Sequence, residues 1–148
     1  MDRAKTGQRS VSLVIPSRVE FIDLVHGAAE QIARLAGCDD SESLNVGIAV
    51  REAVINAILH GNANDPEREV RIGFEVDDDG MRATVLDQGA GFDPEQARDP
   101  TKVENLLESS GRGLLMIRAF VDDVQYRFHE GRGLEVTLVK HRPSGTGS

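Results

Sequence analysis

The sequence is poor in cysteine, in long apolar runs and in basic charge, and each shortage excludes a class of protein. The single cysteine, Cys38, excludes an internal disulfide and a zinc cage built on cysteines. No apolar run approaches the roughly 18 residues needed to cross a bilayer, and the polar residues 1–10 lack the apolar core of a secretory signal. We therefore expect a soluble, cytoplasmic protein.

The charge balance is acidic, with 17 basic and 25 acidic residues and a net charge of −8. Phosphate backbones and anionic membranes are held by clustered Lys and Arg, so direct binding to nucleic acid or to a membrane is not expected. At 148 residues the chain has the size of one ordinary domain. The composition is that of a folded protein, since hydrophobic residues make up 39% of it.

Strand and helix signals alternate between two polar ends. We expect a flexible N-terminus at 1–10, one folded domain at 11–142 and a flexible tail at 143–148. The expected strands are 11–15, 69–76, 81–86, 124–128 and 134–139, and the expected helices are 18–36, a second one running to about His60, and 113–121. This order predicts an α+β fold, a two-layer α/β sandwich whose mixed, mostly antiparallel sheet carries its helices on one face.

Local capping signals predict where the helices begin. Ser17, followed three residues later by Glu20, has the spacing of a capping box for the first helix. Ser41 or Ser43 is expected to cap the second helix. The acidic run 77–80 ends in glycine between two strand signals, so we interpret it as a hairpin turn rather than a cation site.

The second helix carries polar residues within an apolar sequence. Over residues 46–60 only Arg51, Glu52, Asn56 and His60 are polar or charged, so the helix should be largely buried. Glu52, Asn56 and His60 are spaced to lie along one side. These residues could have a purely structural role. Glu52 would then form an ion pair with a nearby Arg, and Asn56 would bind a loop backbone. Alternatively, Asn56 could bind a hydrated Mg²⁺ with Glu52 as a base beside it.

Two glycine clusters follow at positions where a ligand can approach the backbone. Asp87, Gly89 and Gly91 come directly after the strand 81–86, and Asp87 could accept a hydrogen bond from an exocyclic amine such as that of adenine. A turn with an Asx-type aspartate is the structural alternative. The long polar stretch that follows, as far as Ser110, is typical of a functional lid or a disordered segment.

The second cluster opens the helix at 113–121. Gly111, Arg112 and Gly113 place free N–H groups and a guanidinium at a helix N-terminus, which favours phosphate binding. The same tripeptide at 131–133 lies between two strand signals, and there we interpret it as turn chemistry only.

Taken in order, Glu52-x-x-x-Asn56, Asp87-x-Gly89-x-Gly91 and Gly111-x-Gly113-Leu114 resemble the N, G1 and G2 boxes of the GHKL ATPase superfamily. Within it the sequence is most similar to the small anti-sigma factor serine/threonine kinases, through residues 52–62 and 108–117. The resemblance covers nearly the whole chain, from the first strand to Val139.

The resemblance implies a Bergerat ATP-binding fold with an ATP lid at about 92–110. It implies Glu52 as the general base, Asn56 as the Mg²⁺ ligand, and Asp87 as the residue that reads the adenine amine. The other residues it assigns to ATP binding are His60, Gly89, Gly91, Gly111, Arg112, Gly113 and Leu114. The phosphates would then be met by Mg²⁺, backbone amides and Arg112, which reconciles an ATP site with an acidic chain.

The resemblance also implies a reaction and partners. The reaction is transfer of the γ-phosphoryl group to a Ser or Thr of an anti-anti-sigma (STAS) protein, which regulates release of a sigma factor; a homodimer is implied as well. A module that binds ATP or ADP without transferring phosphate is the alternative. A sensor histidine kinase is disfavoured because residues 1–40 contain no His-bearing helical hairpin, and a gyrase- or chaperone-like ATPase because no transducer domain is expected after Val139.

Overall fold

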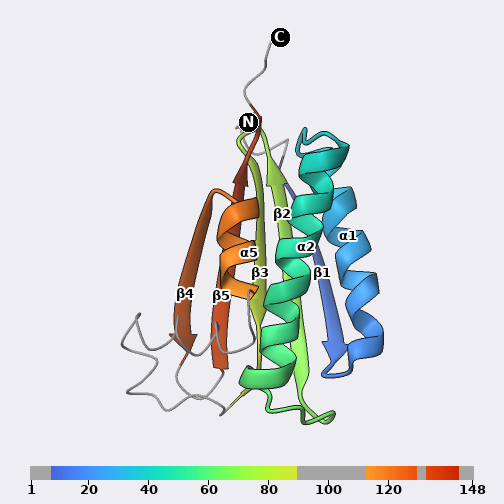
Figure 1. Cartoon of the computed structure of the whole chain (residues 1–148), viewed down its shortest axis with the longest axis vertical. Helices are drawn as coiled ribbons and strands as arrows, with labels where there is room; N and C mark the ends of the chain where they lie inside the picture. Colours follow the sequence, from blue (N-terminus) through green and yellow to red (C-terminus); the bar gives the residue numbers. More distant parts are fainter. Residues whose placement is uncertain (1–7, 90–112, 130–132, 144–148) are drawn as a thin grey trace.

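The computed structural model describes residues 8–89, 113–129 and 133–143. Five strands form one sheet in the order β1-β2-β3-β5-β4, and all four neighbouring pairs are antiparallel. The helices cover one face of this sheet (Figure 1). The strands are β1 (Arg9–Pro16), β2 (Glu69–Asp77), β3 (Gly80–Leu86), β4 (Asp123–His129) and β5 (Gly133–His141), and the helices are α1 (Ile22–Leu35), α2 (Asp40–Asn56) and α5 (Gly113–Phe120).

The predicted α+β sandwich is therefore confirmed, with a sheet that contains no parallel pair among the described strands. The sheet and helices enclose one apolar core, because every second residue of the central strands faces the helices. On β2 these residues are Val70, Ile72, Phe74 and Val76, each at most 3% exposed. Val25 of α1, Val50 of α2 and Ile117 of α5 pack in the same core.

The two capping predictions were wrong. Ser17 does not cap the first helix, because its buried hydroxyl donates to the carbonyl of Arg68 at 2.8 Å. The chain continues through a 3-10 turn, η2 (Val19–Phe21), before α1 begins. The second helix is capped by Asp39, whose carboxylate accepts from the Glu42 N–H at 2.8 Å. The Glu42 carboxylate accepts in return from the Asp39 N–H at 3.1 Å, which completes a capping box.

The second helix does not remain α-helical to His60 as expected. It is an α-helix only to Asn56, and a π turn, η3 (Ala57–Gly61), follows. The Asn62 N–H donates to the Ala57 carbonyl, five residues back, at 2.7 Å. A π turn rotates each residue less than an α-helix does, so His60 is displaced from the line through Glu52 and Asn56.

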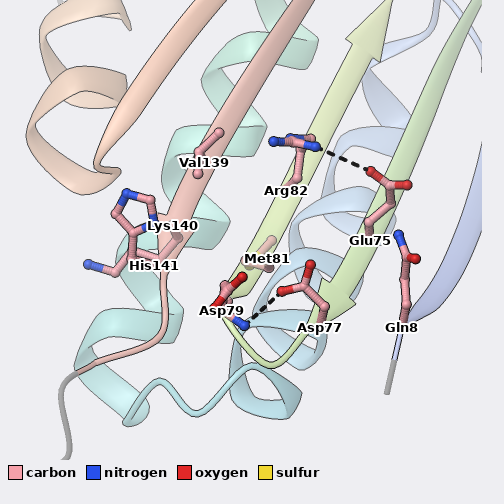
Figure 2. A pocket seen from close by; sticks show the side chains of 10 residues that line it. Gln8, Glu75, Asp77, Asp79, Met81, Arg82, Val139, Lys140 and His141 are labelled. Atoms are coloured by element: carbon pink, nitrogen blue, oxygen red, sulfur yellow. Dashed lines mark hydrogen bonds and ion pairs between the residues drawn. The ribbon is translucent and has the colours of Figure 1, made fainter. Parts of the chain in front are cut away.

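The acidic turn between β2 and β3 lies at the end of the sheet far from the β3 terminus that carries Asp87. Figure 2 shows Asp77 and Asp79 side by side there, with the Asp79 N–H donating to the Asp77 carboxylate at 2.8 Å. Gly80 completes the turn at φ +138°, a conformation that favours glycine. The groove beside it contains acidic and basic side chains together, including the pair Glu75 and Arg82 at 3.9 Å. These features agree with a hairpin turn.

Within the part of the chain that the structure describes, no helix is long and apolar enough to cross a membrane.

Candidate functional site

Helix α2 carries two of the predicted site residues. Asn56, in its last turn, is 3% exposed, although an amide is costly to bury. Glu52 lies one turn earlier and is half-buried. It makes no ion pair or hydrogen bond with any described residue, and its neighbour Arg51 pairs instead with Asp23 at 2.6 Å. The structural ion pair considered for Glu52 is thus not formed within the described residues.

The carboxylate of Asp87 lies at the end of β3 and is 3% exposed. Its Oδ1 accepts two backbone hydrogen bonds, from Gly89 N–H at 2.9 Å and from Leu134 N–H at 3.1 Å. The Asp87 N–H donates in turn to the Leu134 carbonyl at 3.2 Å. These contacts fix the side chain between β3 and β5, and they leave Oδ2 without a hydrogen bond from the described residues.

Burial raises the pKa of the Asp87 carboxyl, and it outweighs the opposing effect of the two backbone N–H donors and of Arg68. Desolvation penalises the charged form, so a ligand that donates to Oδ2 would relieve a cost already present in the unliganded protein.

Asn56 and Asp87 line the same small cavity, which lies between α2, α5 and the sheet. Its other walls are apolar, and they come from five elements of the fold. These walls are Ala53, Ala57, Val85, Ile117, Leu134 and Val136. The cavity is thus an apolar slot with two polar groups at its edge, which is the composition typical of a ligand pocket. Glu52 and His60 do not line this cavity; the Nε2 of His60 is buried and has no hydrogen-bond partner among the described residues.

Three glycines allow the backbone to close around Asp87. A Cβ atom at Gly61 would overlap the Asp87 carboxylate, and one at Gly89 would overlap the Gly61 carbonyl oxygen. Gly133, at φ +120°, has the Asp87 carbonyl where its Cβ would be. From the sequence, Gly61 was predicted only to end a helix and Gly133 only to form a hairpin turn. Their contacts with Asp87 were not predicted. Neither contact has a local sequence signal, because the partners are distant along the chain.

Gly89→Ala is expected to lower both stability and nucleotide affinity. The new methyl group would overlap the Gly61 carbonyl, which is backbone and cannot rotate away. Overpacking of this kind typically costs about 1–3 kcal/mol of unfolding free energy. Thermal melting and calorimetric titration with ATP measure the two effects.

Gly27→Ala is the matched control for this substitution. Gly27 is an exposed position of α1, and no atom lies within 4 Å of a Cβ built there. Alanine is favoured over glycine in a helix by about 0.5–1 kcal/mol, so this variant should melt higher and bind ATP normally. Equal melting temperatures for the two variants would contradict the close packing at Gly89.

Several predicted residues lie outside the described part of the chain. They are Gly91, Gly111 and Arg112, together with the lid at 92–110. Gly113 is the first residue of α5, so the predicted helix start agrees with the structure. Leu114 follows it in the same helix. The expected phosphate end of the site therefore remains a prediction.

The described residues contain no cluster of three or more His, Cys, Asp or Glu side chains that could hold a metal ion. Asn56 would supply one oxygen ligand to a magnesium ion, beside phosphate oxygens and water. This agrees with the chemistry of Mg²⁺, which keeps several waters and commonly takes few protein ligands beside substrate phosphates.

The sandwich fold places a buried carboxylate, Asp87, beside a buried amide, Asn56, in an apolar slot. Residues 15–140 match the histidine kinase-like ATPase domain, and the chain belongs to that family. The predicted resemblance to the GHKL superfamily is thereby confirmed, and ATP is the ligand class that this family implies.

Two relatives indicate the branch of the family. The chain is 40% identical over 104 residues to the anti-sigma F factor of Geobacillus kaustophilus, covering 68% of this chain and 70% of that protein. It is 27% identical over 133 residues to the serine-protein kinase RsbW of Bacillus subtilis, covering 86% and 83%.

A solved structure supports the fold. The RsbU and RsbW domains of Rv1364c from Mycobacterium tuberculosis match with a TM-score of 0.62 at 22% identity. The match covers 90% of this chain and 32% of that longer one. At this level of identity the likeness bears on the fold alone.

Proposed function

We propose that this protein is an ATP-dependent serine/threonine kinase that phosphorylates a Ser or Thr of an anti-anti-sigma (STAS) protein and so regulates sigma-factor availability. The observation that carries the proposal is the arrangement on α2. Glu52, without a partner among the described residues, lies one turn before Asn56, which lines the cavity of Asp87. The names of the relatives, anti-sigma F factor and serine-protein kinase, support the same activity.

Asp87 recognises the base. Its Oδ2 accepts a hydrogen bond from the exocyclic amine of adenine, while Oδ1 stays bound to Gly89 and Leu134. The ring occupies the apolar slot between Ala57 and Val136. Gly89 and Gly91 shape the backbone at this end, and His60 borders the nucleotide from η3.

Asn56 would hold Mg²⁺ through its side-chain oxygen, and the chemistry that the ion would supply is neutralisation of charge on the phosphates. Gly111, Arg112, Gly113 and Leu114 meet the phosphates at the start of α5, through backbone N–H groups and the Arg112 guanidinium. The lid at about 92–110 covers them. The domain spans 11–142 between its polar ends.

Glu52 is the general base. A carboxylate accepts the proton of the incoming Ser or Thr hydroxyl as the oxygen forms its bond to the γ-phosphorus and the bond to the ADP oxygen breaks. The Glu52 carboxylate is available for this step because it makes no ion pair with a described residue.

The proposed partners follow from the reaction. The phosphoryl acceptor is a STAS protein, and a sigma factor is the second partner, whose release depends on the acceptor's phosphorylation. We place the protein in the cytoplasm, where sigma factors act, and as a homodimer.

Incubation with Mg-ATP and a purified STAS protein from the same organism tests the proposal. We expect a phosphoserine or phosphothreonine in the STAS protein, located by peptide mass spectrometry, and ADP released in equal amount. Tight Mg-ATP binding without transfer to any STAS protein offered would instead identify a non-catalytic regulatory module. Failure to bind ATP at all would reject both functions.

A further inference from the structure

The side chain of Asn62 is fully buried, at 0% exposure, directly after η3. Its Nδ2 donates to the Ser17 hydroxyl at 2.7 Å and to the Glu69 carbonyl at 3.0 Å. Its Oδ1 accepts from the Gln88 N–H at 2.8 Å. Both amide hydrogens and the carbonyl oxygen are thus used, which fixes the orientation of the amide.

The backbone around Asn62 is held in an uncommon conformation. Its N–H closes the π turn by donating to the Ala57 carbonyl. The next two residues, Ala63 and Asn64, have φ values of 51° and 60°, in the left-handed region that side chains other than glycine rarely adopt. Such conformations persist where the surrounding structure holds them, and they concentrate at functional sites.

The hydrogen bond to Gln88 connects this turn to the candidate nucleotide site. Gln88 lies between Asp87, which faces the cavity, and Gly89, whose N–H donates to the Asp87 carboxylate. Gly61, the residue before Asn62, packs against the same carboxylate. Asn62 is therefore one of two anchors of the loop that follows Asp87; the other is the Gln88 side chain, whose Oε1 accepts from the Glu69 N–H at 2.6 Å.

The two sides of the Asn62 amide serve different parts of the fold. The Nδ2 side joins the end of β1 to the start of β2, where Ser17 also donates to the Arg68 carbonyl. The Oδ1 side reaches only the loop after Asp87. If Asn62 were purely structural, only its Nδ2 hydrogen bonds would matter. If it positions Asp87, its Oδ1 hydrogen bond to the loop would matter.

We propose that Asn62 is a positioning residue for adenine recognition, acting through Gln88 on Asp87. This inference rests on the proposed ATP-binding function. A loop released from Asn62 allows the Asp87 carboxylate to turn away from the base, so nucleotide affinity and the preference for adenine over guanine both fall. Phosphate transfer at saturating ATP is preserved, because the hydrogen bonds of the Asn62 side chain go to Ser17, Glu69 and Gln88 and not to Glu52 or Asn56.

The experiment compares Asn62→Ala with Ser17→Ala, which breaks the network on the structural side alone. Calorimetric titration with Mg-ATP and Mg-GTP measures the two affinities, at a temperature well below the melting temperature of each variant. Assays of phosphate transfer give KM and kcat. We expect Asn62→Ala to weaken ATP binding by about tenfold and to reduce the ATP-to-GTP ratio, with KM raised and kcat unchanged. Ser17→Ala should melt lower and keep the wild-type affinity.

Equal ATP affinity in wild type and Asn62→Ala would overturn the inference and leave Asn62 a structural residue. If Asn62→Ala does not fold, Asn62→Asp replaces it, since its carboxylate keeps an oxygen for the Gln88 N–H and loses the amide donors. The inference then expects wild-type ATP affinity, and a loss in Asn62→Asp would contradict it. A wild-type protein that binds no nucleotide would reject the proposed function itself, which is a distinguishable outcome.

Discussion

Replacing Glu52 by glutamine is expected to leave Mg-ATP binding intact and to slow phosphate transfer by about two to four orders of magnitude. The substitution keeps the size and shape of the side chain and removes its ability to accept a proton. Binding should survive because Glu52 does not line the cavity shared by Asn56 and Asp87 and makes no contact with a described residue that glutamine would break. Calorimetric titration and single-turnover transfer to a STAS protein measure binding and chemistry separately.

Arg51→Gln is the matched control for this prediction, because it changes the charge of the adjacent residue. Arg51 is 40% exposed at its side chain and pairs with Asp23 on the surface. Surface pairs contribute little, so this variant should fold and transfer phosphate at the wild-type rate. Retained transfer in Glu52→Gln, or an equal loss in Arg51→Gln, would show that Glu52 is not the base.

The polar stripe of α2 could be predicted because it depends only on local spacing. A helix that is apolar nearly all round must be buried, but of its three polar residues spaced four apart only Asn56 lines the cavity. The structure buries Asn56 and places it with Asp87 in one cavity, although Asp87 is 31 positions later in the printed sequence. Asp87 could be predicted as a site residue because it comes directly after a strand and is followed by two glycines.

The π turn and its consequences could not be predicted. Nothing in residues 57–61 distinguishes a π turn from a continued α-helix, since alanine, isoleucine and leucine are accommodated in either. The turn is stabilised by hydrogen bonds of Asn62 to residues 45, 26 and 7 positions away. Interactions at such separations have no local pattern, so the network around Asn62 was visible only in the structure.

The helix starts show the same limit at shorter range. Ser17 and Glu20 have the spacing of a capping box, but the hydroxyl of Ser17 finds the Arg68 carbonyl, 51 residues away. Asp39 and Glu42 have the same spacing and do form the box. The two pairs have the same local spacing, so spacing alone cannot predict which of them forms a capping box.

Asp87→Asn is expected to weaken ATP binding by roughly 10- to 150-fold, because a hydrogen bond to a charged acceptor is replaced by two facing amide donors. The unliganded fold should be preserved, since asparagine keeps an oxygen for the Gly89 and Leu134 N–H groups. Calorimetric titration with Mg-ATP measures the affinity. Asp79→Asn, at the far end of the sheet, makes the same charge change and should bind ATP normally.

The pH dependence of Asp87 provides a second measure of the same site. Burial raises its pKa, so the folded protein holds this proton more tightly than the unfolded chain, and its contribution to stability is lost as pH rises from the ordinary carboxyl range through the raised pKa. Asp87→Asn removes this loss, so the unliganded variant should melt no lower than wild type at neutral pH. ATP affinity has the opposite slope in the wild type, since the ionised carboxylate is the stronger acceptor for the adenine amine, and the affinity should fall as pH drops through the raised pKa. Wild-type affinity in Asp87→Asn, or a pH slope that survives the substitution, would remove Asp87 from the base-binding site.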